Sequence, residues 1–386
     1  MAEESYDVVI IGAGIQGAGV AQAAAVCGYK TLVIEKQAEA GMATSSKSSK
    51  LIHGGLRYLE SGQFSLVKEC LQERKRLLNN APELVKLIPF YIPVYETSTR
   101  PAWKIFLGLC IYSLFSFKPF KVIKKSNWES LDNLKTDGLK HVFKYYDAQT
   151  NDQLLTKSVA ASAQQHGAKF VFNADFQHSE FSEENHHVRY TQNKKEFAVK
   201  SKYIINCSGP WVKETQKKIV PAIKLPHIDL VAGTHIIIDK ETSQGAYYLE
   251  AKDKRAVFII PWKNNQTLIG TTETIHQGSA DSIKTKDQDI NYLLEIYNQN
   301  HSTQINIDNI IDKFTGLRVL PGDNNSAFNK SRDSLIVEGG SCPGLITLIG
   351  GKLTAYRASA EQVVSRIDIQ RSCSVKETRH LKLGII

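Results

Sequence analysis

The chain has 386 residues, of which 42% are hydrophobic and 23% are charged, a composition typical of globular proteins large enough for two domains. Lysines and arginines (48) exceed aspartates and glutamates (39), and the net charge of +9 suits acidic small molecules, an anionic membrane surface or nucleic acid without choosing among them. No stretch reaches the roughly 18 apolar residues of a membrane-spanning helix, and the six scattered cysteines form no metal-ligand set, so we expect an intracellular, metal-free protein with reduced thiols.

The first predicted element is a strand over residues 8–11, whose four consecutive apolar side chains are typical of a parallel strand buried on both faces. The pattern G-x-G-x-x-G follows at Gly12, Gly14 and Gly17, and an alanine-rich helix then continues to about Cys27. In such a turn the first glycine permits the tight bend, the second lets the backbone approach a pyrophosphate, and the third lets the helix pack closely on the sheet. The N-terminus of the helix offers free N–H groups to the phosphates.

A second strand over residues 31–34 is followed by Glu35, which stands where a carboxylate can hold the ribose hydroxyls of a dinucleotide. A lone glycine pattern is weak evidence, but here it follows a strand, opens a helix and precedes an acid at the expected distance. The segment therefore predicts dinucleotide binding, and its position close to the start of the chain favours FAD over NAD.

The segment SSKSSKLIHGGLRYLE, residues 45–60, shows neither helical nor strand periodicity and carries many hydrogen-bond donors. It is either a solvated surface loop or the wall of a pocket for an anion. An amphipathic helix is predicted next, over residues 64–82, and its basic face is expected to be solvated. Short groups of apolar and basic residues alternate over residues 85–125. This segment could contact an anionic lipid surface, or it could form an amphipathic helix packed inside a second domain.

The middle of the chain predicts a mixture of helix and antiparallel sheet. A helix and a strand are expected over residues 155–172, a surface hairpin over residues 176–200, and a strand over residues 203–207. The Ser-Gly-Pro ending of that strand leaves room for a nucleotide to lie across it. Residues 228–272 are typical of antiparallel strands, and a short helix is expected over residues 290–300.

The last part of the chain carries further basic residues beside glycine-rich turns. Arg318 lies in GLRVLPG, and Arg332 begins RDSLIVEGG. The stretch GLITLIGGKLTAYR predicts a strand, the pair Gly350-Gly351, and a helix opened by Lys352. We expect the free N–H groups and the lysine at this helix start to face whatever lies above it.

Together these segments resemble the FAD-dependent glycerol-3-phosphate dehydrogenase family, whose members are membrane-associated and linked to quinone. The motifs that carry the resemblance are IIGAGIQGAGVA, ATSSKSSKLIHGGLRYLE, INCSGPWVK, GTHIIID, LIGTTE, GLRVLPG and LIGGKLTAYR, in family order from near residue 5 to about residue 366. The stretches SSKLIHGGLRYLE and GGKLTAYR are specific to this family and its close oxidase relatives. One departure is Glu273, which ends a Gly-Thr-Thr-Glu stretch where the family usually has aspartate.

The resemblance implies an α/β fold. It consists of a Rossmann-like FAD-binding domain of the glutathione-reductase or D-amino-acid-oxidase type, with an inserted α+β substrate domain that carries a mostly antiparallel sheet. We expect the FAD-binding domain in residues 1–75, 150–215 and 315–370, and the substrate domain in residues 76–149 and 216–314. Family members continue into a helical C-terminal cap, of which residues 371–386 would be a remnant or the start, so we expect most of the cap to be missing.

The resemblance also implies the residues of the site. The cofactor-binding residues would be Gly12, Gly14, Gly17, Glu35, Lys36, Thr44, Ser45, Ser46, Ser49, Leu51, Gly54, Gly209, Gly351, Lys352, Leu353 and Thr354. The substrate-binding residues would be Arg57, Tyr58, Thr272, Arg332 and Lys352. Their basic character agrees with a phosphate dianion, which requires several charge-assisted donors. Residues 45–60 would then form the wall of a pocket rather than a surface loop.

The reaction implied by the family is oxidation of the C2 alcohol of sn-glycerol 3-phosphate to dihydroxyacetone phosphate. A hydride would pass from C2 to flavin N5, and the electrons would pass onward to quinone. Histidine titrates near working pH, so His235 in GTHIIID and His53 in LIHGG are the candidate bases. Arg318 would stabilise the developing alkoxide.

The implied partners are glycerol 3-phosphate, a quinone acceptor and the anionic inner face of the cytoplasmic membrane, on which a cytoplasmic enzyme would rest peripherally. A homodimer stays open, and no motif supports nucleic-acid binding. Two rival hypotheses remain. One is a related FAD oxidase that passes electrons to O2 or acts on another hydroxy acid. The other is a flavin-binding peripheral module that is inactive without its cap.

Overall fold

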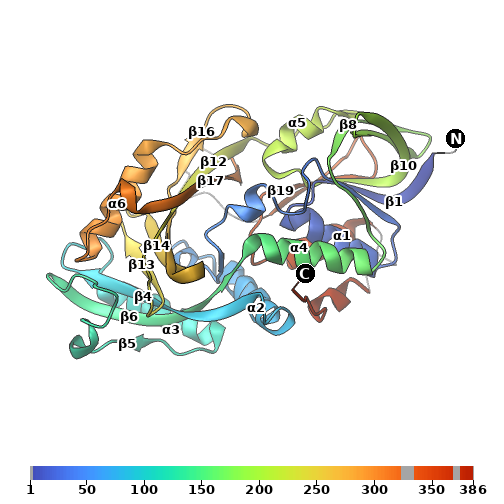
Figure 1. The fold of residues 1–386 in the computed structure, drawn as a ribbon. Helices are drawn as coiled ribbons and strands as arrows, with labels where there is room; N and C mark the ends of the chain where they lie inside the picture. The colour runs from blue at the N-terminus through green and yellow to red at the C-terminus, as the bar shows by residue number, and fades with distance from the viewer. Residues whose placement is uncertain (1–2, 323–333, 368–373, 386) are drawn as a thin grey trace.

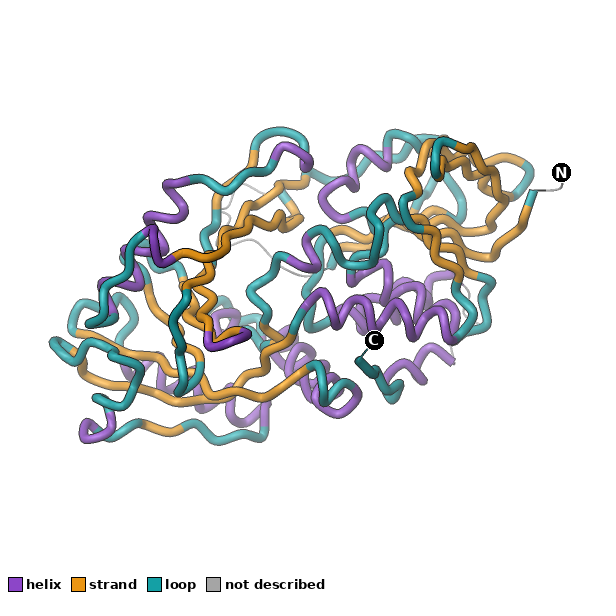
Figure 2. Tube along the Cα trace, viewed as in Figure 1, coloured by secondary structure: helices purple, strands orange, loops and turns teal. Residues whose placement is uncertain are grey.

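The computed structural model describes residues 3–322, 334–367 and 374–385, and the elements in them gather around two sheets (Figure 1). Each sheet forms the centre of one lobe, and the two lobes lie side by side. Along the chain, strands of the first sheet alternate with strands of the second, so neither lobe is formed by one continuous stretch of sequence. The segments that converge between the lobes are mostly loops (Figure 2).

The first sheet has the strand order β11-β8-β9-β10-β1-β2-β7, with β19 against β10 and β18 against β19. Strands β7, β2, β1, β10 and β19 pair in parallel, whereas β8, β9 and β10 form an antiparallel meander. The strands are β1 (Glu4–Ile11), β2 (Thr31–Ile34), β7 (Lys169–Val171), β8 (Ala174–Ser182), β9 (Asn185–Gln192), β10 (Lys195–Asn206), β11 (Ile219–Val220), β18 (Leu335–Glu338) and β19 (Leu345–Ile349).

Strand β1 is buried on both faces, as its apolar run predicts. Val8 and Ile10 pack on the helical side of the sheet, whereas Val9 and Ile11 pack on the other side against β8 and β9. Because successive side chains of a strand alternate between faces, one hydrophobic run serves two cores. The helices on the helical side are α1 (Ile15–Val26), α4 (Asp152–Gln165) and α7 (Tyr356–Ile367).

The second sheet has the strand order β16-β12-β15-β14-β13-β4-β6-β3, with β17 against β12 and β5 against β6. Among the described pairs all are antiparallel except β4 with β13. The strands are β3 (Leu51–Ile52), β4 (Val85–Tyr95), β5 (Lys121–Val122), β6 (Leu139–Thr150), β12 (Ile228–Ile238), β13 (Ala246–Glu250), β14 (Ala256–Trp262), β15 (Gln266–Gly270), β16 (Thr274–His276) and β17 (Ile310–Pro321).

Helices cover both faces of the second sheet. Leu293 packs on one face beside Ile236, and Leu71 and Leu109 pack on the other beside Phe90. These residues place α6 on one face and α2 and α3 on the other. The helices are α2 (Phe64–Asn80), α3 (Ala102–Ser116) and α6 (Asp287–Asn300), and the short helix α5 (Val212–Gln216) follows β10 in the first lobe.

The predicted helices over residues 64–82 and 290–300 are confirmed as α2 and α6, and the predicted strand over residues 31–34 is confirmed as β2. The hairpin expected over residues 176–200 is confirmed, because β8 and β9 pair antiparallel and β9 continues into a second antiparallel pair with β10. Strand β10 is continuous over twelve residues, so the strand expected over residues 203–207 is its last part and the preceding polar segment belongs to the first sheet.

The helix start expected at Lys352 is also wrong, because α7 begins at Tyr356. Gly350 and Gly351 have φ angles of 70° and 98°, which a right-handed helix excludes, and a turn separates them from the helix.

The predicted domain limits stay a prediction. Strand β17 crosses the limit expected at residue 315, and β3, which lies inside the segment 1–75, pairs with the second sheet. Among the helices described, none combines the length and the apolar character needed to cross a bilayer.

Candidate functional site

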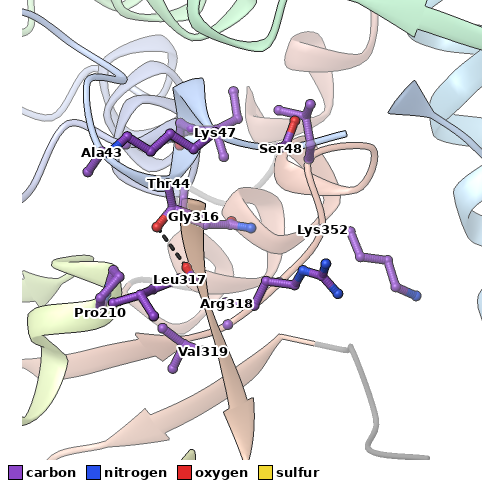
Figure 3. Close-up of a pocket in the computed structure, with 18 of the residues that line it drawn as sticks. Ala43, Thr44, Lys47, Ser48, Pro210, Gly316, Leu317, Arg318, Val319 and Lys352 are labelled. Atoms are coloured by element: carbon purple, nitrogen blue, oxygen red, sulfur yellow. Dashed lines mark hydrogen bonds between the residues drawn. The ribbon is translucent and has the colours of Figure 1, made fainter. Parts of the chain in front are cut away.

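A cavity of about 430 Å³ lies between the two lobes (Figure 3). Its walls include the turn between β1 and α1, parts of residues 43–58 and 207–218, residues 350–354, and residues of β12 and β17. The walls from the first lobe follow the carboxyl ends of the parallel strands β1, β10 and β19. Open α/β sheets bind their ligands at this edge.

The turn between β1 and α1 brings backbone close to the cavity. Gly12 has a φ of 98°, and a Cβ there would lie 2.8 Å from the Cys207 carbonyl oxygen. A Cβ on Gly17 would lie 1.9 Å from the Gly12 carbonyl oxygen, so only glycine lets α1 begin this close to β1. Gly14, the N-cap of α1, lines the cavity without a side chain. A phosphate can therefore approach the positive end of the helix dipole, which fits a dinucleotide.

Glu35 follows β2 and lines the same cavity. Its carboxylate is buried and accepts hydrogen bonds from Ala13 N at 2.5 Å and from Gln37 N at 2.8 Å. Burial raises the pKa of Glu35, and the two N–H donors oppose that rise. The acid is thus held rigidly beside the glycine turn, at the place expected of a ribose-binding group.

Lys36 takes part in a contact between the lobes. Its Nζ lies 3.4 Å from the centroid of the Trp211 ring and 3.3 Å from Asp281 Oδ1, which also accepts a hydrogen bond from Trp211 Nε1 at 3.0 Å. Lys36 and Trp211 both line the cavity. The structure therefore places Lys36 in the cavity wall beside Glu35. Its ammonium contacts both the Trp211 ring and the Asp281 carboxylate.

The segment from Thr44 to Ser49 runs between α1 and β17. Thr44 Oγ1 donates a hydrogen bond to the Leu317 carbonyl oxygen at 2.8 Å, the dashed line in Figure 3. Ser45 Oγ accepts one from Ile15 N, in the first turn of α1, at 2.9 Å. These contacts connect the segment to both lobes and hold it against the cavity.

His235 on β12 is buried in the cavity wall. Its ring stacks on Phe314 with the centroids 4.9 Å apart, and its Nε2 lies 2.9 Å from Ser49 Oγ. Burial lowers the pKa of His235 well below its ordinary value, and the positive charges of Arg318 and Lys50 lower it further. His235 is therefore neutral at physiological pH, and the neutral ring is the form that can accept a proton.

Arg318 extends into the cavity from β17 (Figure 3). Its Nη1 donates to Glu273 Oε1 at 2.8 Å, and its Nη2 donates to Thr271 Oγ1 at 3.2 Å. A Cβ on Gly233 would lie 2.7 Å from that Nη2, so the glycine leaves room for the guanidinium.

Lys352 reaches the cavity from the first lobe. Its Nζ lies 4.2 Å from the centroid of the Tyr58 ring and 3.8 Å from Cys70 Sγ. Arg57 and His53 line the same cavity. Together with the arginine on β17, these basic side chains come from three separate segments of the chain. The arrangement suits a small ligand that carries negative charge.

A buried polar network holds the loop that precedes Arg57. The Tyr112 hydroxyl accepts a hydrogen bond from Gly54 N at 2.8 Å and donates one to Asp147 Oδ2 at 2.7 Å. Arg74 forms an ion pair with Asp147 Oδ1. Burial raises the pKa of Asp147, and the Arg74 charge opposes that rise. The loop thus contacts a buried ion pair inside the second lobe.

Most of the predicted site residues meet in this one cavity. Those that line it are Gly12, Gly14, Glu35, Lys36, Thr44, Ser45, Ser49, Leu51, His53, Arg57, Tyr58, Gly209, His235, Arg318, Gly351, Lys352, Leu353 and Thr354.

Four predicted residues do not line it. Gly17 packs α1 against β1, and Gly54 binds the buried network. The Ser46 hydroxyl lies within hydrogen-bond distance of the Met42 and Ala43 carbonyl oxygens, to which it can donate its one hydrogen. Thr272 is buried and its Oγ1 accepts a hydrogen bond from a backbone N–H of β12, and its contact with substrate stays a prediction. Arg332 lies outside the described residues.

Two residues at this site were not predicted from the sequence: Glu273, which lines the cavity, and Phe314, which packs beside it. The sequence marks Glu273 only as a departure from the family pattern, and it carries no signal for Phe314, which stacks on His235. The acidic end of the Gly-Thr-Thr-Glu stretch was the available signal for Glu273. Its partner Arg318 lies 45 residues away, so no local spacing pointed to the pair.

Known proteins resemble this chain over most of its length. A family model described as FAD dependent oxidoreductase matches residues 7–357. The aerobic glycerol-3-phosphate dehydrogenase of Escherichia coli (strain K12) is 32% identical, over 94% of this chain and 74% of that protein. The glycerol-3-phosphate dehydrogenase of Synechocystis sp. is 36% identical, over 94% and 70%. The D-erythritol 1-phosphate dehydrogenase of Brucella abortus (strain 2308) is 33% identical, over 95% and 74%.

Two solved structures share the fold. The glycerol-3-phosphate dehydrogenase from Bacillus halodurans complexed with FAD has a TM-score of 0.74 and 24% identity, over 100% of this chain and 67% of that chain. The L-α-glycerophosphate oxidase from Mycoplasma pneumoniae with FAD bound has a TM-score of 0.76 and 17% identity, over 94% and 95%. The predicted α/β fold type is thereby confirmed.

Proposed function

This chain belongs to the FAD-dependent glycerol-3-phosphate dehydrogenase family, and from that premise we propose that it oxidises sn-glycerol 3-phosphate to dihydroxyacetone phosphate. It is an FAD-dependent oxidoreductase, as the sequence resemblance implied. FAD, when bound, would supply the two-electron chemistry of this oxidation. One observation supports the substrate above all: Arg57, Arg318 and Lys352 line the same cavity as the G-x-G-x-x-G turn.

The residues present fit FAD. Gly12 allows the turn to pass close to the Cys207 backbone, Gly14 lines the cavity without a side chain, and α1 offers its N-terminus there. Glu35 would hold the ribose hydroxyls, because its carboxylate is fixed beside that turn. Thr44 and Ser45 would border the flavin ring from the segment that runs between α1 and β17.

We assign the phosphate to Arg57 and Lys352, with Tyr58 beside them. A phosphate dianion is bound best by several charge-assisted donors, and a guanidinium and an ammonium supply them. The Lys352 ammonium lies against the Tyr58 ring, so the tyrosine keeps the lysine side chain in place.

We assign the reacting alcohol to Arg318 and His235. Arg318 would donate to the C2 oxygen and stabilise the negative charge that develops on it. His235 is neutral, so it can take the hydroxyl proton, although its lowered pKa makes it a weaker base than an ordinary histidine. Ser49 contacts Nε2 and would orient the ring. His53, which also lines the cavity, is the other candidate base.

A quinone is the electron acceptor that we propose, in keeping with the family. The oxidase from Mycoplasma pneumoniae has the same fold, so reduction of O2 is the competing hypothesis. A longer phosphorylated polyol is a second candidate substrate, because the D-erythritol 1-phosphate dehydrogenase of Brucella abortus is 33% identical.

We further propose that the enzyme docks on the anionic inner face of the cytoplasmic membrane through α3 and the segment after it. Trp103, Leu114 and Phe117 are 68%, 69% and 83% exposed. The exposed lysines of this surface are Lys104, Lys118, Lys121, Lys124 and Lys125. Apolar side chains that insert between lipids, next to lysines that meet anionic headgroups, are typical of an interfacial helix. A homodimer stays a prediction.

Vesicle flotation tests the docking surface. Binding should require anionic phosphatidylglycerol and should fall in a Trp103→Ser, Phe117→Ser double variant. Ile307→Ser is the matched control, since Ile307 is 57% exposed but lies away from α3 in the sequence. Equal binding by the double variant and the wild type would refute the docking surface.

Anaerobic flavin spectra test the reaction. Glycerol 3-phosphate should bleach the oxidised flavin bands. A parallel sample with D-erythritol 1-phosphate tests whether the second candidate substrate also reduces the flavin. Admitting O2 after reduction separates an oxidase, which reoxidises at once, from a dehydrogenase, which awaits a quinone. A flavin that stays oxidised with both substrates would refute the proposed function and favour an inactive flavin-binding module.

A further inference from the structure

Glu273 reaches the cavity from the link between β15 and β16. Its side chain is 7% exposed, and its Oε1 accepts the hydrogen bond from Arg318 Nη1 at 2.8 Å. The link itself is held from another side, because Arg255 Nη1 donates to the Glu273 carbonyl oxygen at 3.3 Å. A buried carboxylate is thus fixed against the arginine that β17 extends into the cavity.

Two further features hold the Arg318 guanidinium in place. Its Nη2 donates to Thr271 Oγ1 at 3.2 Å, and the Thr271 hydroxyl is itself oriented by donating to the Thr272 carbonyl oxygen at 3.1 Å. Gly233 leaves the space that this edge of the guanidinium occupies. A guanidinium presents its donors in a rigid planar fork, so holding Nη1 and Nη2 sets the direction of its remaining N–H groups.

We infer that Glu273 is a positioning residue, which with Thr271 aims the Arg318 guanidinium at the oxygen on the reacting carbon. This inference rests on the proposed function. A carboxylate beside Arg318 compensates its charge, so the guanidinium serves as an oriented donor to a hydroxyl or alkoxide rather than as a site for a dianion. Among the residues that the structure describes, Arg57 and Lys352 are then the ones left for the phosphate.

The charges that act on the pKa of His235 support the same inference. The Arg318 charge helps to lower the pKa of His235, and the Glu273 carboxylate lies on the guanidinium, where it offsets part of that charge. Removing the carboxylate should therefore make His235 a still weaker base while it frees Arg318 to move.

Kinetics of the FAD-loaded enzyme test the inference. Glu273→Gln removes the charge but keeps an acceptor, Glu273→Ala removes both, and Glu273→Asp keeps the charge on a shorter side chain. Glu338→Gln is the matched control, because Glu338 pairs with Arg366 at 3.0 Å on the surface with its side chain 64% exposed. The control should behave as the wild type.

We expect Glu273→Gln and Glu273→Ala to lower kcat by about 10- to 100-fold with KM within about threefold, because the lost contact strengthens only as the alkoxide forms. Glu273→Asp should recover at least about tenfold over Glu273→Ala. An unchanged kcat, or a raised KM at unchanged kcat, would overturn the inference. A loss of about 10⁴-fold in Glu273→Gln that aspartate does not recover would also overturn it, since Glu273 would then transfer the proton itself.

Crystal structures of the substrate-free variants test the same role without catalysis, because they show the position of Arg318. Arg318 should keep its place in the wild type and in Glu273→Asp, and should be displaced or disordered in Glu273→Ala. An Arg318 that stays in place without Glu273 would overturn the positioning role. A wild type that fails to oxidise glycerol 3-phosphate would refute the proposed function instead, and the Arg318 position would still decide the role of Glu273.

Discussion

Alanine at Gly17 should damage both the first lobe and FAD binding, because the added methyl group has no room. Its Cβ would lie 1.9 Å from the Gly12 carbonyl oxygen, whereas real Cβ atoms essentially never approach within 3.0 Å of a neighbour. Relief requires α1 to move away from β1 by about 1 Å in a close-packed interior. Overpacking of this kind lowers the free energy of unfolding by about 1–3 kcal/mol.

The same movement should displace the N–H groups at the start of α1 from the pyrophosphate. Losing one charge-assisted hydrogen bond costs about 1.5–3 kcal/mol, so the Kd for FAD should rise by at least about tenfold. Urea unfolding of the FAD-free protein measures the first effect, and an FAD titration followed by flavin fluorescence measures the second.

Gly14→Ala is the matched control. The φ and ψ of Gly14 are −65° and 175°, which alanine adopts freely, and the nearest atom to its Cβ is Ser45 Oγ at 3.3 Å. Stability without FAD should stay unchanged or rise by about 0.4–1 kcal/mol, while the methyl group in the cavity weakens FAD binding. The reasoning is refuted if Gly17→Ala unfolds and binds FAD as the wild type does, or if Gly14→Ala destabilises the FAD-free protein equally.

Three further predictions follow from the site and the core. Arg57→Ala should raise the KM for glycerol 3-phosphate by about 10- to 100-fold without loss of FAD, because a charge-assisted phosphate contact is removed; equal losses of both would contradict the assignment. Glu35→Ala should weaken FAD binding in the same titration with little change in substrate preference, and an unchanged FAD affinity would count against the ribose role. Burial lowers the pKa of His186 and of His301 to about 4, so between about pH 4 and pH 6.5 these two side chains bind more protons in the unfolded chain than in the folded one. Stability in urea should therefore fall from about pH 6.5 towards pH 4, by up to about 1.4 kcal/mol per pH unit for each histidine, and glutamine at both positions should flatten that slope.

The nucleotide end of the site was predictable because its determinants are local. Strand β1, the glycine turn, α1, β2 and Glu35 occupy one continuous stretch of the chain. A hydrophobic run and a glycine spacing report directly on backbone geometry, so the predicted β2 agrees with the structure and α1 ends one residue before the expected Cys27.

The substrate end was less predictable. Strand β4 contains Pro89 and Pro93, and proline withholds a donor from the ladder, so the segment lacked a clear strand pattern. The orientation of Thr271 and Thr272 was not predictable from the sequence either. Sequence shows that two threonines precede Glu273, but only the pairing of β12 with β15 and β16 decides which hydroxyl faces the cavity.

The sequence by itself determined the local geometry of this protein: the glycine turn, the helix that follows it, the acid after β2, and the basic residues available for an anion. The tertiary structure alone decided which distant residues meet. Ser49 lies 186 residues from His235, and Glu273 lies 45 residues from Arg318, yet both pairs are in hydrogen-bond contact. Those distances depend on how the two sheets are placed across one cavity, and neither a period nor a local spacing along the chain encodes that placement.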